Sequence, residues 1–148
     1  MNDKQVVNPS YIHLLSVDIL KARIQSEFEA LSEDSIEFQF DMSSTNGFNV
    51  VEKLVRFELE INLVKKNAEG RIIGECSFTI SFVFQIENFE EVVEEKEGGI
   101  VFNGAMAATL GGIAFSTARG ILLTRFQGTA FRDFILPVID PKKVFEDE

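Results

Sequence analysis

The chain has 148 residues, of which 45% are hydrophobic, and its formal net charge at pH 7 is −10. This length and composition suit one domain, residues 1–148, with a hydrophobic core of its own. The negative charge would repel nucleic-acid phosphates and anionic lipid, so we expect no nucleic-acid partner and no direct membrane insertion. Basic segments of other proteins are the natural complement.

The chain has one cysteine, Cys76, and one histidine, His13, which excludes an intrachain disulfide and a Cys/His zinc site. A single thiol is consistent with a reducing compartment. Residues 1–10 lack the charged-then-apolar order of a signal peptide, and we expect no apolar run of the roughly 20 residues that a membrane-spanning helix needs. The expected location is therefore the cytoplasm.

The first third of the chain predicts β-structure. Residues 11–28 fit neither period cleanly, and we favour a long strand with a bulge over a helix. Residues 36–42 alternate between apolar and polar side chains, as a half-buried strand does. Asn46 and Gly47 predict a turn after it.

Two further segments alternate in the same way. They comprise residues 55–63 and 76–86, and the polar stretch 65–70 between them ends in glycine. This order predicts a hairpin of two long antiparallel strands.

Composition changes after residue 86. Six glutamates crowd residues 87–99, and two glycines close that stretch, so we expect an exposed connection rather than core. From residue 104 onward small residues dominate and predict a helix.

The small residues of this helix recur at helical spacing. Gly104, Ala108 and Gly112 lie four apart, as do Ala107 and Gly111, and positions four apart share one helix face. A helical glycine costs roughly 0.5 to 1 kcal/mol relative to alanine, so a compensating close contact is needed. We expect this helix to be buried both by its own sheet and by another subunit; the alternative is a helix that breaks near Gly111 and Gly112.

The sequence contains no catalytic constellation. It lacks a phosphate-binding Gly-x-x-x-x-Gly-Lys loop, a His-Glu-x-x-His motif and a Gly-x-Ser-x-Gly elbow. Cys76 falls in the apolar series of its strand, where a packed, inert thiol is expected, and His13 fits an ordinary strand residue. Asp18 and the other acidic strand residues fit a solvated sheet face. We therefore expect no enzyme activity, no cofactor and no metal.

The aromatic residues are almost all phenylalanine: 15 Phe, one Tyr and no Trp. Several lie in segments too irregular to be all core, namely Phe89, Phe126, Phe131, Phe134 and Phe145. Phe residues rimmed by glutamate could hold extended apolar polypeptide without a fixed sequence, or they could pin down the C-terminal segment. The sequence leaves both explanations open.

A set of landmarks in the C-terminal third resembles the SecB protein-export chaperones. They are Leu110-Gly111, Phe115-Ser116-Thr117-Ala118-Arg119, Arg125, Gly128-Thr129 and Pro137-Val138. The resemblance implies an α+β fold, in which a four-stranded antiparallel sheet packs on a long C-terminal helix with a short second helix. It also implies an ATP-independent holdase that assembles as a tetramer, a dimer of dimers, and delivers unfolded polypeptide to the SecA motor.

The resemblance also assigns sites. The implied client groove comprises Phe89, Val92, Val93, Phe131, Phe134 and Ile135. The implied SecA-facing positions on the sheet are Asp18, Ile73 and Glu75, whereas Ala22 stands where the family carries a further acid.

The chain departs from the family at several points. Ser116 replaces a proline, Phe126-Gln127 is inserted, the acidic connection 87–99 is longer, and the second helix is cut to about residues 141–148. These changes leave three alternatives open: a dedicated chaperone for one partner such as an antitoxin, an adaptor that binds through the acidic sheet face, and a binder of a small apolar ligand.

Overall fold

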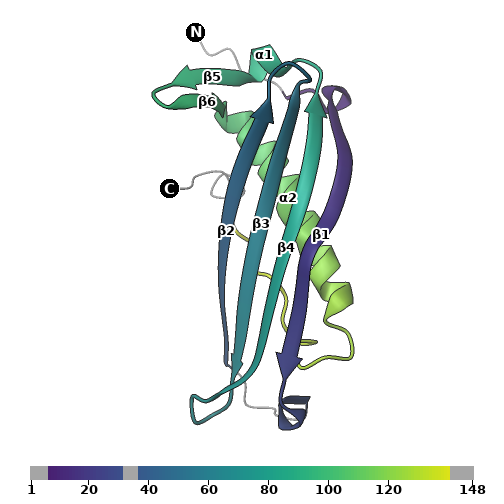
Figure 1. The fold of residues 1–148 in the computed structure, drawn as a ribbon, viewed down its shortest axis with the longest axis vertical. Coiled ribbons are helices and arrows are strands. Elements are labelled where there is room, and N and C mark those ends of the chain that lie inside the picture. The colour runs from purple at the N-terminus through teal and green to yellow at the C-terminus, as the bar shows by residue number, and fades with distance from the viewer. Residues whose placement is uncertain (1–6, 32–36, 141–148) are drawn as a thin grey trace.

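A long, twisted antiparallel sheet forms one layer of the structure (Figure 1). The computed structural model describes residues 7–31 and 37–140. The sheet has the order β1-β4-β3-β2, which leaves β1 and β2 at its edges. Its strands are β1 (Ile12–Ser26), β2 (Glu37–Asn49), β3 (Leu54–Lys66) and β4 (Ile72–Ile86).

The remaining elements follow β4 in the sequence. A single turn of helix, α1 (Phe89–Val92), leads into a small ribbon of β5 (Val93–Lys96) and β6 (Gly99–Phe102), and then into α2 (Gly104–Arg125). Two short 3-10 helices, η1 (Pro9–Tyr11) and η2 (Phe28–Leu31), flank β1. The expected α+β architecture of a four-stranded antiparallel sheet and a long helix is confirmed.

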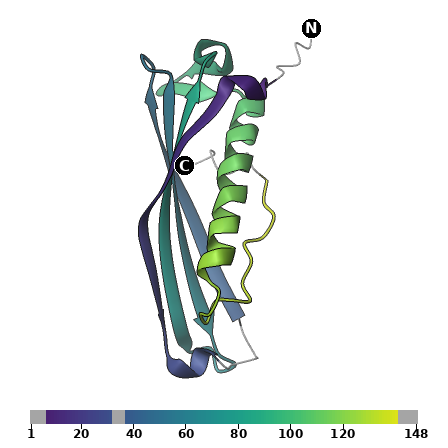
Figure 2. The ribbon, with the colours of Figure 1, turned by 90° about the vertical axis from the view of Figure 1, so that its right-hand side faces the viewer.

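Helix α2 runs along one face of the sheet, which we call the inner face (Figure 2). The alternation of β3 and β4 places their apolar residues on this face, where Phe57, Phe82 and Ile80 are fully buried. Leu110 and Phe115 of α2 are buried in the same core. The core therefore lies between α2 and the two central strands.

Two strand predictions have different outcomes. Strand β1 is a long strand with two register shifts against β4, as the irregular pattern of residues 11–28 indicates. Strand β2 continues through Gly47, which pairs with Arg56, and the chain turns only at residues 50–53. The predicted turn at Asn46-Gly47 is wrong because pairing with β3 outweighs the local turn preference.

We call residues 87–103 the crossover, and this segment is only partly exposed. All six of its glutamates are exposed, but Phe89 and Val92 are buried. The expectation that this stretch contributes nothing to the core is therefore wrong for these two side chains.

Helix α2 is continuous. Its N-cap is Asn103, whose side chain accepts a hydrogen bond of 2.8 Å from the backbone N–H of Met106. No break occurs at Gly111 or Gly112, and Gly111 is buried. The predicted second helix at 141–148 lies outside the described residues, as does Phe145.

Candidate functional site

The inner face of β2 is only partly covered. The same-face residues of β3 are fully buried, whereas Phe40 is 37% and Phe48 is 36% exposed, and Phe38 and Met42 are only partly buried. The difference arises because β2 is an edge strand. We call Phe38, Phe40, Met42 and Phe48 the apolar strip.

Aromatic clusters close both ends of this strip. The crossover cluster consists of Phe48, Phe89 and Phe102, with ring centroids 5.3 to 6.2 Å apart. The C-terminal cluster is built around Phe134, whose ring centroid lies 5.3 Å from that of Phe38 and 5.9 Å from that of Phe40. Its other members are Phe126 and Phe131.

The residues predicted to line a groove are divided between these two ends. Phe89, Val92 and Phe131 are buried, Val93 and Phe134 are half-buried, and Ile135 is 58% exposed. Most of them therefore form the walls of the site rather than an open binding surface.

The sequence predicted a half-buried strand over residues 36–42 but not that the apolar face of this strand is partly exposed. Alternation identifies the apolar face of a strand but carries no information on whether that strand is central or at an edge. The order of the strands in the sheet decides whether β2 is central or at an edge, and the crossover decides how much of its inner face is covered. Both depend on tertiary structure.

The two sheet edges differ in regularity. Strand β1 contains shifts between Leu14 and Ser16 and between Ile19 and Lys21, and such bulges discourage further strand pairing. Strand β2 pairs with β3 along its 13 residues without a shift. Among residues 7–31 and 37–140 no strand pairs with its other edge. An extended peptide can therefore approach β2 beside the apolar strip.

The outward face of α2 carries small residues. Gly104 is exposed and Ala108 and Gly112 are partly exposed, as the small-residue spacing predicts; Ala107 is also partly exposed, whereas Gly111 faces the core. Ser116 and Gly120 continue the same face of α2 and are exposed, although the sequence did not single them out for this face.

Helix α2 is also long and apolar enough to cross a membrane by length and composition, so the expectation of no such run is wrong. The core helix of a soluble protein passes the same test, and residues such as Leu110, Ala114 and Ala118 are fully buried against the sheet layer.

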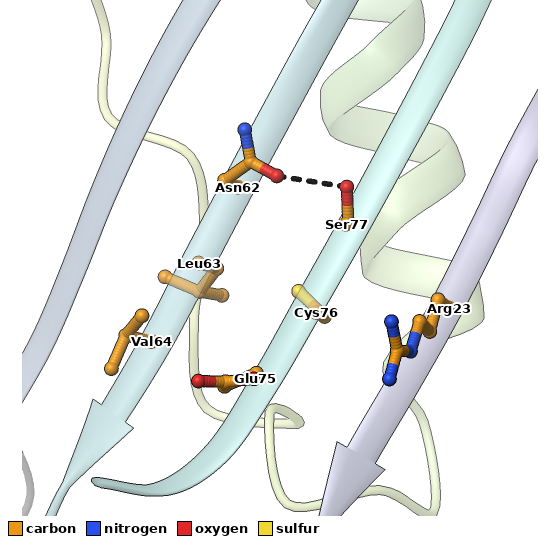
Figure 3. A pocket seen from close by; sticks show the side chains of 7 residues that line it. All are labelled: Arg23, Asn62, Leu63, Val64, Glu75, Cys76 and Ser77. Atoms are coloured by element: carbon orange, nitrogen blue, oxygen red, sulfur yellow. Dashed lines mark hydrogen bonds between the residues drawn. The ribbon is translucent and has the colours of Figure 1, made fainter.

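The outer face of the sheet is polar and carries both signs of charge. Asp18 and Glu75 are exposed on it, but Ile73 is buried at 2% exposure and does not belong to this face. A shallow hollow of about 240 Å³ lies near Glu75 and Arg23. Figure 3 shows Asn62 and Ser77 above these residues, where the Ser77 hydroxyl lies 2.8 Å from Asn62 Oδ1 and donates to it.

Cys76 and His13 are the remaining residues that the sequence singled out for their chemistry. Burial raises the pKa of the Cys76 thiol to about 12, so this group stays protonated and unreactive, as expected. His13 lies in β1 with its ring 3.0 Å from Glu87. Within the described residues, no cluster of His, Cys, Asp or Glu could hold a metal ion.

The antiparallel order β1-β4-β3-β2, followed by a crossover and a long helix on the inner face, defines a SecB-like fold. The solved structure of the Mycobacterium tuberculosis Rv1957 SecB-like chaperone, in complex with a ChAD peptide from the Rv1956 HigA1 antitoxin, is similar with a TM-score of 0.61. The alignment covers 88% of this chain and 91% of that chain at 9% sequence identity, so the likeness concerns the fold. No family model and no curated protein matches the sequence.

Proposed function

We propose that this protein is an ATP-independent holdase that binds extended, non-native polypeptide along the apolar strip of β2. The observation that carries the proposal is the partly exposed row of Phe38, Phe40 and Met42, with Phe48 beyond Ser44 and Asn46, beside the fully buried inner-face residues of β3. Such a row would be a liability for aggregation unless it served binding.

The chemistry of the strip suits clients of varied sequence. Phenylalanine contributes a large apolar surface without a hydrogen-bonding group, so it does not select for a complementary polar atom. The crossover carries exposed glutamates beside the strip, and the net charge of −10 keeps a client-loaded protein soluble. We therefore expect a preference for apolar segments that contain basic residues.

The structural comparison supports a polypeptide client. The Rv1957 chaperone binds a peptide from an antitoxin, which agrees with the narrower version of the proposal, a dedicated chaperone for one partner. Delivery to SecA and a cytoplasmic location are further parts of the proposal, which rest on the sequence resemblance.

We also propose a homo-oligomer, in which the outward face of α2 meets a second copy. The exposed or partly exposed Gly104, Ala108, Gly112, Ser116 and Gly120 would allow close backbone approach. A dimer of dimers is the assembly that we expect.

A second candidate function is an adaptor that binds one folded partner through the outer face. Its support is the exposure of Asp18 and Glu75 on a polar sheet surface. Reversing both charges, with Asp18→Lys and Glu75→Lys, would abolish partner capture by an adaptor but leave client binding by a holdase intact.

Light scattering of a denatured client provides the test of the main proposal. We expect the protein to suppress client aggregation at stoichiometric ratios without nucleotide. Absence of suppression at a several-fold excess of this protein would contradict it.

A further inference from the structure

The last described segment, residues 133–140, lies across the C-terminal end of the site, and we call it the strap. Leu136 is buried and Phe134 and Ile139 are partly buried, whereas Ile135 is 58% exposed and Val138 is 87% exposed. An extended apolar client laid on the same surface would likewise bury some of its side chains and expose others.

The chain just before the strap is firmly anchored. The Lys65 ammonium, itself buried, donates to the backbone carbonyls of Ala30 at 2.6 Å and Ala130 at 2.9 Å. The Arg132 guanidinium donates to the carbonyl of Leu31, and the Phe131 ring is fully buried. These contacts fix the chain as far as Arg132.

The strap has much weaker attachments. In the described part of the chain, no backbone group of residues 135–139 bonds to another backbone group. Its carbonyls at Leu136 and Pro137 accept hydrogen bonds of 3.2 and 3.3 Å from the side chain of Arg119 on α2. Segments held by a few side-chain contacts open with low free energy while the core stays folded.

The strap also occupies the place that a client would need. The ring of Phe134 packs on those of Phe38 and Phe40, which are half of the apolar strip. Arg119 on α2 holds the next residues, and Figure 2 shows the chain running back alongside this helix.

We propose that the strap is an exchangeable internal occupant of the client site, which shields the apolar strip in the empty protein and is displaced when a client binds. This inference rests on the proposed holdase function and adds its regulation. Apparent client affinity is then lowered by the fraction of time that the strap covers the strip.

Thiol labelling reports this exchange directly, because the native Cys76 is buried and unreactive. The variant Leu136→Cys places a thiol on the buried side of the strap, and Val138→Cys provides a matched control on its exposed side. The probe client is a cysteine-free, fluorescein-labelled 16-residue peptide with Phe and Leu spaced among Ser, Gly and Lys. Fluorescence anisotropy measures its binding to each variant independently of labelling.

We expect the peptide to accelerate labelling of Leu136→Cys severalfold and to leave Val138→Cys unchanged. Arg119→Gln, which weakens the two strap hydrogen bonds, should raise the labelling rate of Leu136→Cys without peptide and tighten peptide binding, each by roughly tenfold. Peptide binding with unchanged or slower labelling of Leu136→Cys would overturn strap displacement while leaving the holdase function standing. Absence of peptide binding in every variant would overturn both.

Hydrogen exchange of the unsubstituted protein provides a second readout that needs no variant. The amides of Ile135, Leu136, Val138 and Ile139 should exchange much faster than those of β3, and faster still with the peptide bound. Protection of these amides at the level of β3 would contradict the proposal.

Discussion

Replacing Phe40 with alanine tests the proposed client site at its centre. Phe40 is 37% exposed, and its ring centroid lies 5.9 Å from that of Phe134 in the C-terminal cluster. A phenylalanine buries about 200 Å², so roughly 75 Å² remains for a client to cover, which corresponds to ~1.9 kcal/mol at about 25 cal/mol per Å². Because alanine retains part of this contact, we expect a loss of about 1.4 kcal/mol, a tenfold weakening of client binding.

The assay is fluorescence anisotropy with the labelled peptide described above. Phe28→Ala provides the matched control, because Phe28 is 90% exposed on η2 and is not part of the apolar strip. The control should bind the peptide as tightly as the unsubstituted protein. Equal affinity of Phe40→Ala and the unsubstituted protein, or equal weakening by both substitutions, would refute the reasoning.

Three further predictions concern the scaffold. Gly74→Ala should lower the free energy of unfolding by about 1 kcal/mol in urea titrations, because the added Cβ would lie 3.2 Å from Phe131 Cζ. Gly47→Ala is the control and should leave the free energy of unfolding unchanged, because its Cβ meets nothing within 4 Å. Gly120→Leu should dissociate the oligomer in sedimentation velocity without unfolding α2, because its Cβ also meets nothing within 4 Å of its own chain; an unchanged oligomer would exclude this helix face. Arg71 holds the pKa of Glu27 below its ordinary value. The stability that this ion pair contributes should therefore be full above the ordinary carboxyl pKa of about 4.3 and decline as pH falls further. Arg71→Gln should reduce this acid sensitivity, measured as the pH dependence of the urea unfolding midpoint.

Much of the sheet could be predicted from the sequence because its strands follow a strict period of two. In β3, buried Val55, Phe57 and Leu59 alternate with more exposed Arg56 and Glu58. Helix α2 and its outward small residues were predictable from a different spacing, because residues four apart share one helix face.

The client site was less accessible to such reasoning because it depends on which strand lies at the edge. Phe40 and Phe57 each lie between two polar residues of an alternating strand, yet one is 37% exposed and the other fully buried. Phe89 looked exposed among its glutamates but packs against Phe48, 41 residues earlier in the chain. Contacts between segments so distant in sequence leave no local signal.

Site-specific photo-crosslinking tests the central claim most directly. A photoreactive phenylalanine analogue at position 42 would lie on the apolar strip, and the same analogue at position 60 would lie on the outer face of β3. We predict that a denatured client forms adducts from position 42 and few from position 60. Adducts from position 60 with none from position 42 would contradict binding along the inner face of β2.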